Sequence, residues 1–184
     1  MNRRRLYTLI ISAMLCAIGI IIPMISPIRI LIEPASFTLG SHIAIFIGMF
    51  VSPVCAIAVA IGTTIGFLLA AFPLTIVLRA ASHLIFAICG ALILKKRPEI
   101  LDKAIPMAVF AFLISLMHAV CEILVIIPFY FTNQLKGSFY DMGFLTSVVL
   151  VLGVGSLVHS LIDFAIARVV WVPLKNMTRK NLGT

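Results

Sequence analysis

Six ionisable side chains interrupt the apolar sequence in three pairs, and the members of each pair are four positions apart. The pairs are Arg79–His83, His118–Glu122 and His159–Asp163. On a helix this spacing places both side chains on one face, one turn apart. An ionisable group at bilayer depth is costly unless it faces a partner or a water-filled cavity. We therefore predict one polar site between helices that binds a small, water-soluble molecule.

Each of these side chains also has a structural interpretation. Arg79 keeps its proton and needs an anion, either a protein carboxylate or the carboxylate of a ligand. Glu122 can accept two hydrogen bonds from an aminopyrimidine-like edge, neutralise Arg79, or carry a proton. Asp163 can hold His159 or bridge two helices, and His83 can be an interhelical histidine. The pattern leaves binding and internal pairing as alternatives.

The motifs indicate neither catalysis nor a cofactor. The four histidines, at positions 42, 83, 118 and 159, lie in different apolar runs without a His-Glu-x-x-His motif, so we predict no metal site. The sequence has no Gly-x-x-x-x-Gly-Lys-Ser/Thr phosphate loop, so any ATP hydrolysis belongs to a partner. Asn133 follows the fifth apolar run and can reach a ligand or cap its helix.

Composition places the chain in a membrane. It is 62% hydrophobic and 11% charged over 184 residues, whereas soluble domains carry about 25% charged residues. The net charge of +8 does not indicate nucleic-acid binding, because the basic residues flank apolar spans and form no continuous patch. We predict a multi-pass protein of a bacterial cell membrane.

The apolar runs predict an all-α membrane protein with six transmembrane helices in one substrate-binding domain, residues 1–184. A span needs about 20 apolar residues. The predicted spans are 6–25, 38–52, 54–71, 73–95, 104–131 and 144–171. Breaks at Ser52-Pro53 and Ala71-Phe72-Pro73 predict tight turns.

Charge asymmetry predicts the orientation. The basic clusters at 3–5, 95–103 and 175–180 fall on one side of the six spans, whereas only Arg29 and Lys136 fall in the opposite loops. Cytoplasmic loops carry the excess of Lys and Arg. Both termini are therefore expected in the cytoplasm.

The first outer loop, residues 26–37, has an extended rather than a helical pattern. β-branched residues alternate around 28–32, and Pro27 and Pro34 bound the segment. Because the loop is apolar yet outside, we predict that it folds back over the bundle as a lid. The alternative is a loop that lies along the membrane interface.

Small residues recur four positions apart on three spans, as Ala13-x-x-x-Ala17, Gly62-x-x-x-Gly66 and Ala87-x-x-x-Ala91. Such pairs let helix backbones approach closely in lipid. Internal packing is the first expectation for each pair, and a partner interface is the alternative.

Over nearly its whole length the sequence resembles the substrate-binding S components of energy-coupling factor (ECF) vitamin transporters. The resemblance rests on chain size, six spans with both ends inside, a basic N-terminus, a lid-like first loop and Ala13-x-x-x-Ala17. It implies vitamin capture outside by the first loop and the last three helices. It also implies a transmembrane coupling subunit, onto which Ala13 and Ala17 would dock, and two ATPases.

The segment from Glu33 to His42 is similar to that of hydroxymethylpyrimidine- and niacin-type S components. A free Arg79 would favour a carboxylate such as nicotinate, whereas an internally paired Arg79 would favour neutral hydroxymethylpyrimidine. We expect hydroxymethylpyrimidine, with niacin or pantothenate as alternatives. The rival functions are a solitary proton-coupled carrier using Glu122 and Asp163, and a membrane enzyme with a histidine-bound metal.

Overall fold

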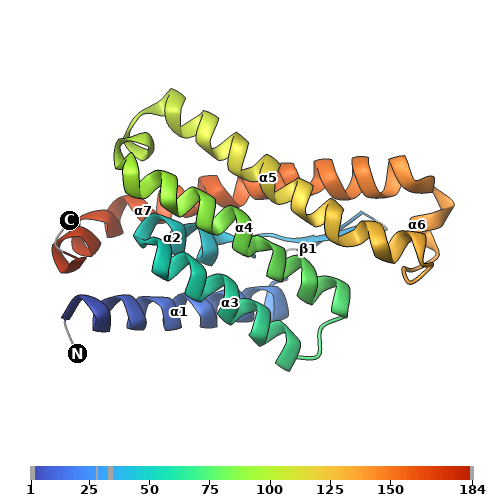
Figure 1. Cartoon of the computed structure of the whole chain (residues 1–184), viewed down its shortest axis with the longest axis horizontal. Coiled ribbons are helices and arrows are strands. Elements are labelled where there is room, and N and C mark those ends of the chain that lie inside the picture. Colours follow the sequence, from blue (N-terminus) through green and yellow to red (C-terminus); the bar gives the residue numbers. More distant parts are fainter. Residues whose placement is uncertain (1–2, 28, 33–34, 183–184) are drawn as a thin grey trace.

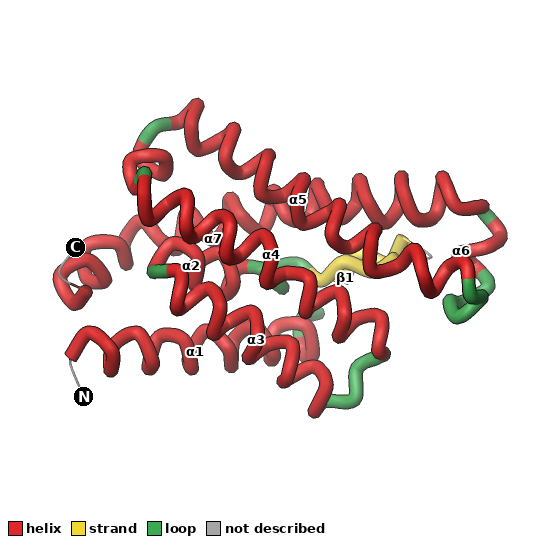
Figure 2. The backbone as a smooth tube through the Cα atoms, in the orientation of Figure 1, coloured by secondary structure: helices red, strands yellow, loops and turns green. Residues whose placement is uncertain are grey.

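The chain folds as a bundle of helices with one small β-hairpin (Figures 1 and 2). The computed structural model describes residues 3–27, 29–32 and 35–182. The elements are α1 (Arg3–Ile25), β1 (Arg29–Ile32), β2 (Ala35–Thr38), α2 (Ile43–Val51), α3 (Pro53–Leu69), α4 (Leu74–Lys96), η1 (Pro98–Asp102), α5 (Ala104–Phe131), α6 (Ser138–Asp141), η2 (Leu145–Val154) and α7 (Gly155–Leu182).

Four segments of the described chain are long and apolar enough to cross a membrane, which makes this a multi-pass membrane protein. They are Arg5–Ile25, Leu74–Lys96, Ala104–Phe131 and Leu145–Lys175. Helix α3 has 17 residues and is about 26 Å long, slightly less than a hydrocarbon core of about 30 Å. Four of the six predicted spans therefore have a helical segment of sufficient length and apolarity in the described chain, and six spans stay a prediction.

The predicted second span, 38–52, is the one that differs most. Its helical part, α2, has nine residues and is about 14 Å long, roughly half a bilayer core. The helix cannot begin earlier because Gly40 takes a φ of +87°, which L side chains rarely adopt. The predicted span consists of the end of β2, a turn and a half-length helix.

Both ends of the described chain lie at the same end of the bundle (Figure 1). The α4–α5 connection, which contains η1, lies there too, whereas the α3–α4 turn and α6 lie at the opposite end (Figure 1). The predicted turns are present: Ser52 is extended and its Oγ accepts the Cys55 N–H at 3.1 Å, and Ala71 has a φ of +56°. That the termini face the cytoplasm stays a prediction.

The extended pattern of the first loop is confirmed for its described residues. Strands β1 and β2 pair antiparallel, with Arg29 opposite Thr38. Phe37 at the end of β2 is buried and a Cβ on Gly155 would meet its ring at 2.4 Å, so the hairpin packs on the start of α7. Glu33 and Pro34 lie outside the described residues, and the lid function stays a prediction.

The three small-residue pairs differ in whether they pack inside the bundle. A Cβ on Gly62 would meet Cys16 Sγ at 2.5 Å, and one on Gly66 would meet Ile20 at 2.2 Å, so both glycines let α3 approach α1. Ala87 and Ala91 are fully buried, as internal packing predicts. Ala13 and Ala17, by contrast, are exposed on the outer face of α1.

The apolar core fills the half of the bundle nearer the termini. Phe46 and Phe86 are fully buried, and Phe164 packs edge-on against Phe46 at 5.3 Å between ring centroids. Helix α2 contributes to this core along nearly its whole length. The polar residues begin where α2 begins.

Candidate binding site

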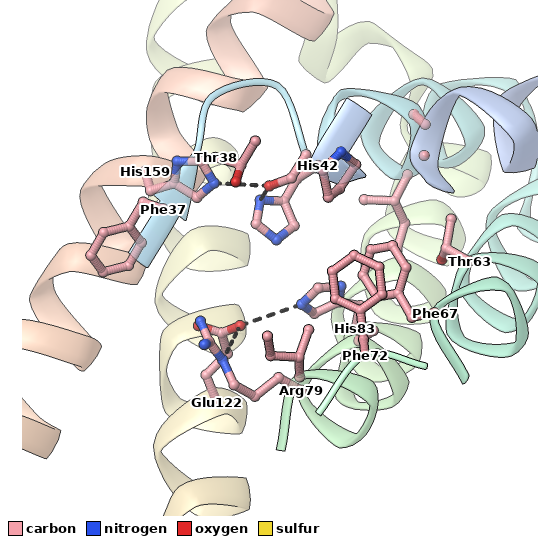
Figure 3. Close-up of a pocket in the computed structure, with 17 residues that line it drawn as sticks. Phe37, Thr38, His42, Thr63, Phe67, Phe72, Arg79, His83, Glu122 and His159 are labelled. Carbon is pink, nitrogen blue, oxygen red and sulfur yellow. Dashed lines mark hydrogen bonds and ion pairs between the residues drawn. The ribbon is translucent and has the colours of Figure 1, made fainter. Parts of the chain in front are cut away.

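A cavity of about 150 Å³ lies beside the N-terminus of α2. An engineered apolar cavity of about this volume in another protein binds benzene, so a single six-membered aromatic ring fits. The cavity has a polar wall and aromatic residues on two sides, with Phe37 beside His159 and with Phe67 and Phe72 across from it (Figure 3). Its polar lining consists of Thr38, Ser41, His42, Thr63, Arg79, His83, Glu122 and His159, and its aromatic lining of Phe37, Phe67 and Phe72.

The strongest polar contact in the site joins α4 to α5. Arg79 donates from Nε to Glu122 Oε1 at 3.0 Å and from Nη2 to Oε2 at 2.9 Å. Ser156 Oγ on α7 also donates to Oε2. A two-pronged guanidinium–carboxylate pair is both strong and orientationally fixed, so Glu122 is held rigidly at the junction of three helices.

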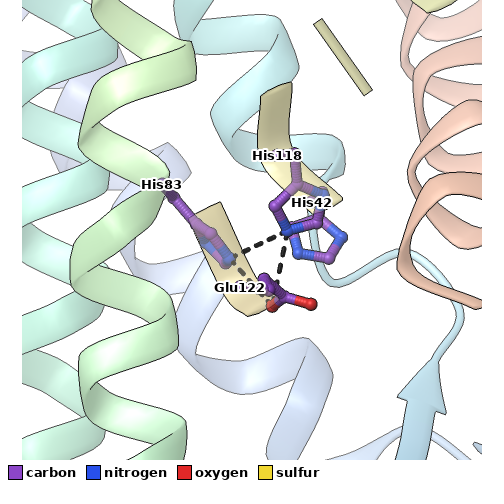
Figure 4. A group of neighbouring side chains, drawn as sticks. All are labelled: His42, His83, His118 and Glu122. Atoms are coloured by element: carbon purple, nitrogen blue, oxygen red, sulfur yellow. Dashed lines mark hydrogen bonds and ion pairs between the residues drawn. The ribbon is translucent and has the colours of Figure 1, made fainter. Parts of the chain in front are cut away.

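Two histidines face the other side of the same carboxylate (Figure 4). His83 Nε2 lies 3.5 Å and His118 Nε2 lies 3.4 Å from Glu122 Oε1. The two Nε2 atoms are 3.2 Å apart and share a hydrogen bond. The pairs at 79–83 and 118–122 therefore form one cluster rather than two.

Asp163 has a different task, because it binds the N-terminus of α2. Its Oδ1 accepts the Gly40 N–H at 2.7 Å, and its Oδ2 accepts the His42 N–H at 2.9 Å. His42 Nδ1 lies 3.1 Å from Oδ2 as well. The first N–H groups of a helix lack partners within the helix, and a carboxylate there is favoured by the helix dipole. This contact allows α2 to begin inside the bundle.

The third pair is completed by a hydroxyl from the loop before α2. His159 Nε2 lies 3.4 Å from Asp163 Oδ2 and 3.0 Å from Ser41 Oγ. The rings of His42 and His159 are 5.0 Å apart between centroids, and those of His42 and His118 are 4.5 Å apart. All four histidines of the chain thus meet around His42.

The structure brings together most of the residues that the sequence predicted for the site. Arg79, His83, Glu122 and His159 line the cavity, whereas His118 and Asp163 are fully buried behind its wall. Asn133 does not line the cavity. Its side chain is exposed just beyond α5, and its φ of +56° makes it a turn residue. A vitamin contact by Asn133 stays a prediction without support from this geometry.

Several lining residues were not singled out from the sequence. His42 is not among the three spaced pairs of the sequence, yet its ring lies within 5.0 Å of the rings of the other three histidines. Phe67 and Phe72, which stack at 4.8 Å between centroids, flank the α3–α4 turn and look like common membrane apolar residues. Ser156 lies three positions before His159, on the same helix face. This spacing is the sequence signal that could have identified Ser156 as a site residue.

Together, the polar and aromatic residues that line the cavity suit a flat, polar ligand. The guanidinium of Arg79 still has Nη1 and one hydrogen of Nη2 available after pairing with Glu122, since arginine carries five N–H donors. The imidazoles of His83 and His159 can donate or accept. Phe37 and the stacked Phe67 and Phe72 offer faces for a ring.

The chain is similar to the niacin transporter NiaX of Lactococcus lactis subsp. cremoris (strain MG1363), with 41% identity over 166 residues. The alignment covers 90% of this chain and 73% of NiaX. No family model matches the sequence, and no solved structure matches it. This relative is named for niacin, one of the alternatives from the sequence, and not for hydroxymethylpyrimidine.

Proposed function

The chain belongs to the ECF S-component family, which includes the niacin transporter NiaX, and from this premise we propose that it captures niacin in the cavity beside α2. The similarity to NiaX over most of the chain is the observation that carries the proposal. The size of the cavity and its mixed polar and aromatic lining support it, because niacin is a single pyridine ring with one carboxylate.

The internal pairing of Arg79 does not argue against an anionic ligand. From the sequence, a paired Arg79 was expected to indicate neutral hydroxymethylpyrimidine, and that rule was too simple. Glu122 occupies Nε and one hydrogen of Nη2, which leaves three of the five N–H donors of Arg79, and Arg79 lines the cavity. In the proposed complex these donors bind the niacin carboxylate, while Glu122 holds the guanidinium in place.

The ring of niacin would lie between Phe37 and the stacked pair Phe67 and Phe72. Offset or edge-on contacts between aromatic rings are favourable beyond the area that they bury. His83 or His159 would meet the pyridine nitrogen. The loop before α2 would close the site, because Ser41 and His42 are part of its wall.

Delivery across the membrane would require partners. We propose that the chain has no catalytic activity of its own and docks through α1 onto a transmembrane coupling subunit, which works with two ATPases in the bacterial membrane. The exposure of Ala13 and Ala17 supports this surface, since small residues let a partner helix approach. Ala13→Trp and Ala17→Trp should block assembly and leave niacin binding intact.

Calorimetry on the purified chain tests the substrate. Niacin should bind with a dissociation constant of micromolar or lower, and hydroxymethylpyrimidine and pantothenate should bind at least a hundredfold more weakly. Equal or tighter binding of hydroxymethylpyrimidine would refute the niacin assignment. Uptake into vesicles should require the coupling subunit and ATPases; uptake by the chain alone, abolished by an uncoupler, would instead identify a proton-coupled carrier.

A further inference from the structure

Three lone-pair-bearing atoms converge on one point at the polar wall of the cavity (Figure 4). They are His83 Nε2, His118 Nε2 and Glu122 Oε1, with mutual distances of 3.2, 3.4 and 3.5 Å. A fourth residue, His42, offers a ring nitrogen within 4.8 Å of the others. These residues come from α4, α5 and the start of α2, so the fold assembles the group.

These three atoms are hydrogen-bonded as they stand: the two Nε2 atoms share one hydrogen bond, and Glu122 Oε1 accepts another from Arg79 Nε. When both histidines carry their hydrogen on Nδ1 instead, both Nε2 atoms present lone pairs beside the carboxylate oxygen. One cation at the centre would then accept a lone pair from all three atoms at once.

The distances fit a tetrahedral transition-metal ion. Nitrogen and oxygen ligands lie 2.0–2.2 Å from zinc, so two ligand atoms of a tetrahedral site are about 3.3–3.5 Å apart. Two of the distances in the cluster, 3.4 and 3.5 Å, fall in this range, and the third, 3.2 Å, is slightly shorter. Imidazole and carboxylate are also the ligand types that zinc accepts.

The hydrogen bonds that these side chains already make leave an acceptor position on Glu122 Oε1 and the second ring nitrogen of His42 available to an ion. Glu122 Oε2 accepts hydrogen bonds from Arg79 and Ser156, while Oε1 accepts one from Arg79. A carboxylate oxygen accepts two bonds, so the free position is on Oε1, which faces the histidines. His42 Nδ1 is held by Asp163 at 3.1 Å, and its other ring nitrogen points toward His83 and Glu122 (Figure 3). A carboxylate behind a ligating histidine is the usual support in metal sites.

We propose that His83, His118 and Glu122, joined by His42, bind one divalent ion of the zinc type at the wall of the cavity. A second grouping, His42, His159 and Asp163, also has metal-capable atoms close together. It is less suited, because Asp163 Oδ2, the oxygen that lies near both histidines, already accepts the His42 N–H and has His42 Nδ1 at 3.1 Å.

The ion would also reverse the net charge of the site, and this part of the inference rests on the proposed function. With neutral histidines, Arg79, Glu122 and Asp163 give the site one net negative charge, which disfavours the niacin carboxylate. A divalent ion changes this to one net positive charge. Unlike charges attract strongly where water is scarce, so the ion should tighten niacin binding.

The test uses Co²⁺, whose visible absorption reports tetrahedral coordination. The purified full chain, stripped with a chelator, should take up one Co²⁺ per chain and develop an intense visible band that Zn²⁺ abolishes. His83→Gln and His118→Gln should each lose the band, and thermal unfolding should confirm that at least one of them is folded. A wild-type chain without a saturable band would overturn the proposal.

His159→Gln is the matched control, because His159 faces the same cavity from outside the proposed ligand set. It should keep the band; loss of the band in this variant alone would move the ion to the second grouping and refute the assignment. Niacin affinity should rise at least tenfold when Zn²⁺ is added to stripped protein. A cobalt band with unchanged niacin affinity would overturn the role of the ion, whereas a cobalt band without any niacin binding would overturn the proposed function instead.

Discussion

Glu122 and Asp163 are both fully buried carboxylates four residues after a histidine, and yet they do different work. Asp163 accepts hydrogen bonds from the backbone N–H groups of Gly40 and His42, at the start of α2. Its role is therefore structural. Within the described residues, the hydrogen bonds of Glu122 come from the side chains of Arg79 and Ser156, and Glu122 lines the cavity. The same sequence pattern therefore encodes a structural bond in one helix and a binding surface in another.

The difference shows where a membrane protein can hold an irregular backbone. Non-helical chain at membrane depth is tolerated only where its polar groups are satisfied inside the protein or line a wet cavity. Asp163 satisfies the start of α2, and this leaves His42 and Ser41 beside the cavity. Half-length helices whose N-termini face a ligand are a recurring device in transporters.

Removal of Asp163 should have the largest effect. Asp163→Ala leaves the Gly40 and His42 N–H groups without partners, at about 1–3 kcal/mol each, and we expect the folded protein to be lost or its unfolding temperature to fall sharply. Asp163→Asn keeps one acceptor oxygen, so its unfolding temperature should lie between those of the wild type and Asp163→Ala. Thermal unfolding in detergent measures both; a wild-type unfolding temperature in Asp163→Ala would show that α2 does not depend on this carboxylate.

Loss of Arg79 should mainly affect binding. Arg79→Met removes the donors proposed for the niacin carboxylate and leaves Glu122 unpaired, so we expect affinity to fall about a hundredfold, or about 2.7 kcal/mol. The double variant Arg79→Met/Glu122→Met should regain stability, since replacing a buried ion pair with apolar residues is often neutral, but should not regain binding. Titration calorimetry and thermal unfolding together measure this, and restored affinity in the double variant would contradict the role of Arg79.

Filling the cavity should have a smaller effect. Ala80 is buried at the cavity wall, and Ala80→Leu should weaken niacin binding about tenfold, or about 1.4 kcal/mol, by occupying ring space. Ala81→Leu is the matched control, because Ala81 is exposed on the same helix. Equal affinities for the two variants, measured by calorimetry, would place the ligand elsewhere.

The smallest effect is expected at His159, which touches both regions. His159→Gln keeps a hydrogen-bonding group near Ser41, so niacin affinity should change by less than about fivefold, or roughly 1 kcal/mol. A loss as large as that of Arg79→Met in the same assay would mean that the α7 side of the cavity carries the main contact.

The convergence of the three pairs was predictable from sequence, because polar residues on one face of a membrane helix must find partners. The breaks at Ser52-Pro53 and before Pro73 were also readable, since proline restricts the residue before it. The true start of α2 was not. Thr38 to Val51 reads as one apolar run, and the turn at Gly40 depends on Asp163, more than a hundred residues later.

The identity of the ligand could not be read from Arg79 alone. Whether a buried arginine has donors to spare depends on the geometry of its partner, here the two-pronged contact with Glu122. Asn133 illustrates the opposite problem. Its position after α5 allowed a ligand contact or a helix cap, and in the structure it is an exposed turn residue that does not line the cavity.

An experimental structure of the chain with niacin bound tests the central claim most directly. The account predicts the pyridine ring inside the cavity beside the α2 N-terminus, with its carboxylate within hydrogen-bonding distance of Arg79 and its face against Phe37 or Phe67. Niacin bound at the 132–143 loop, with the cavity between α4, α5 and α7 closed around the Arg79–Glu122 pair, would contradict it.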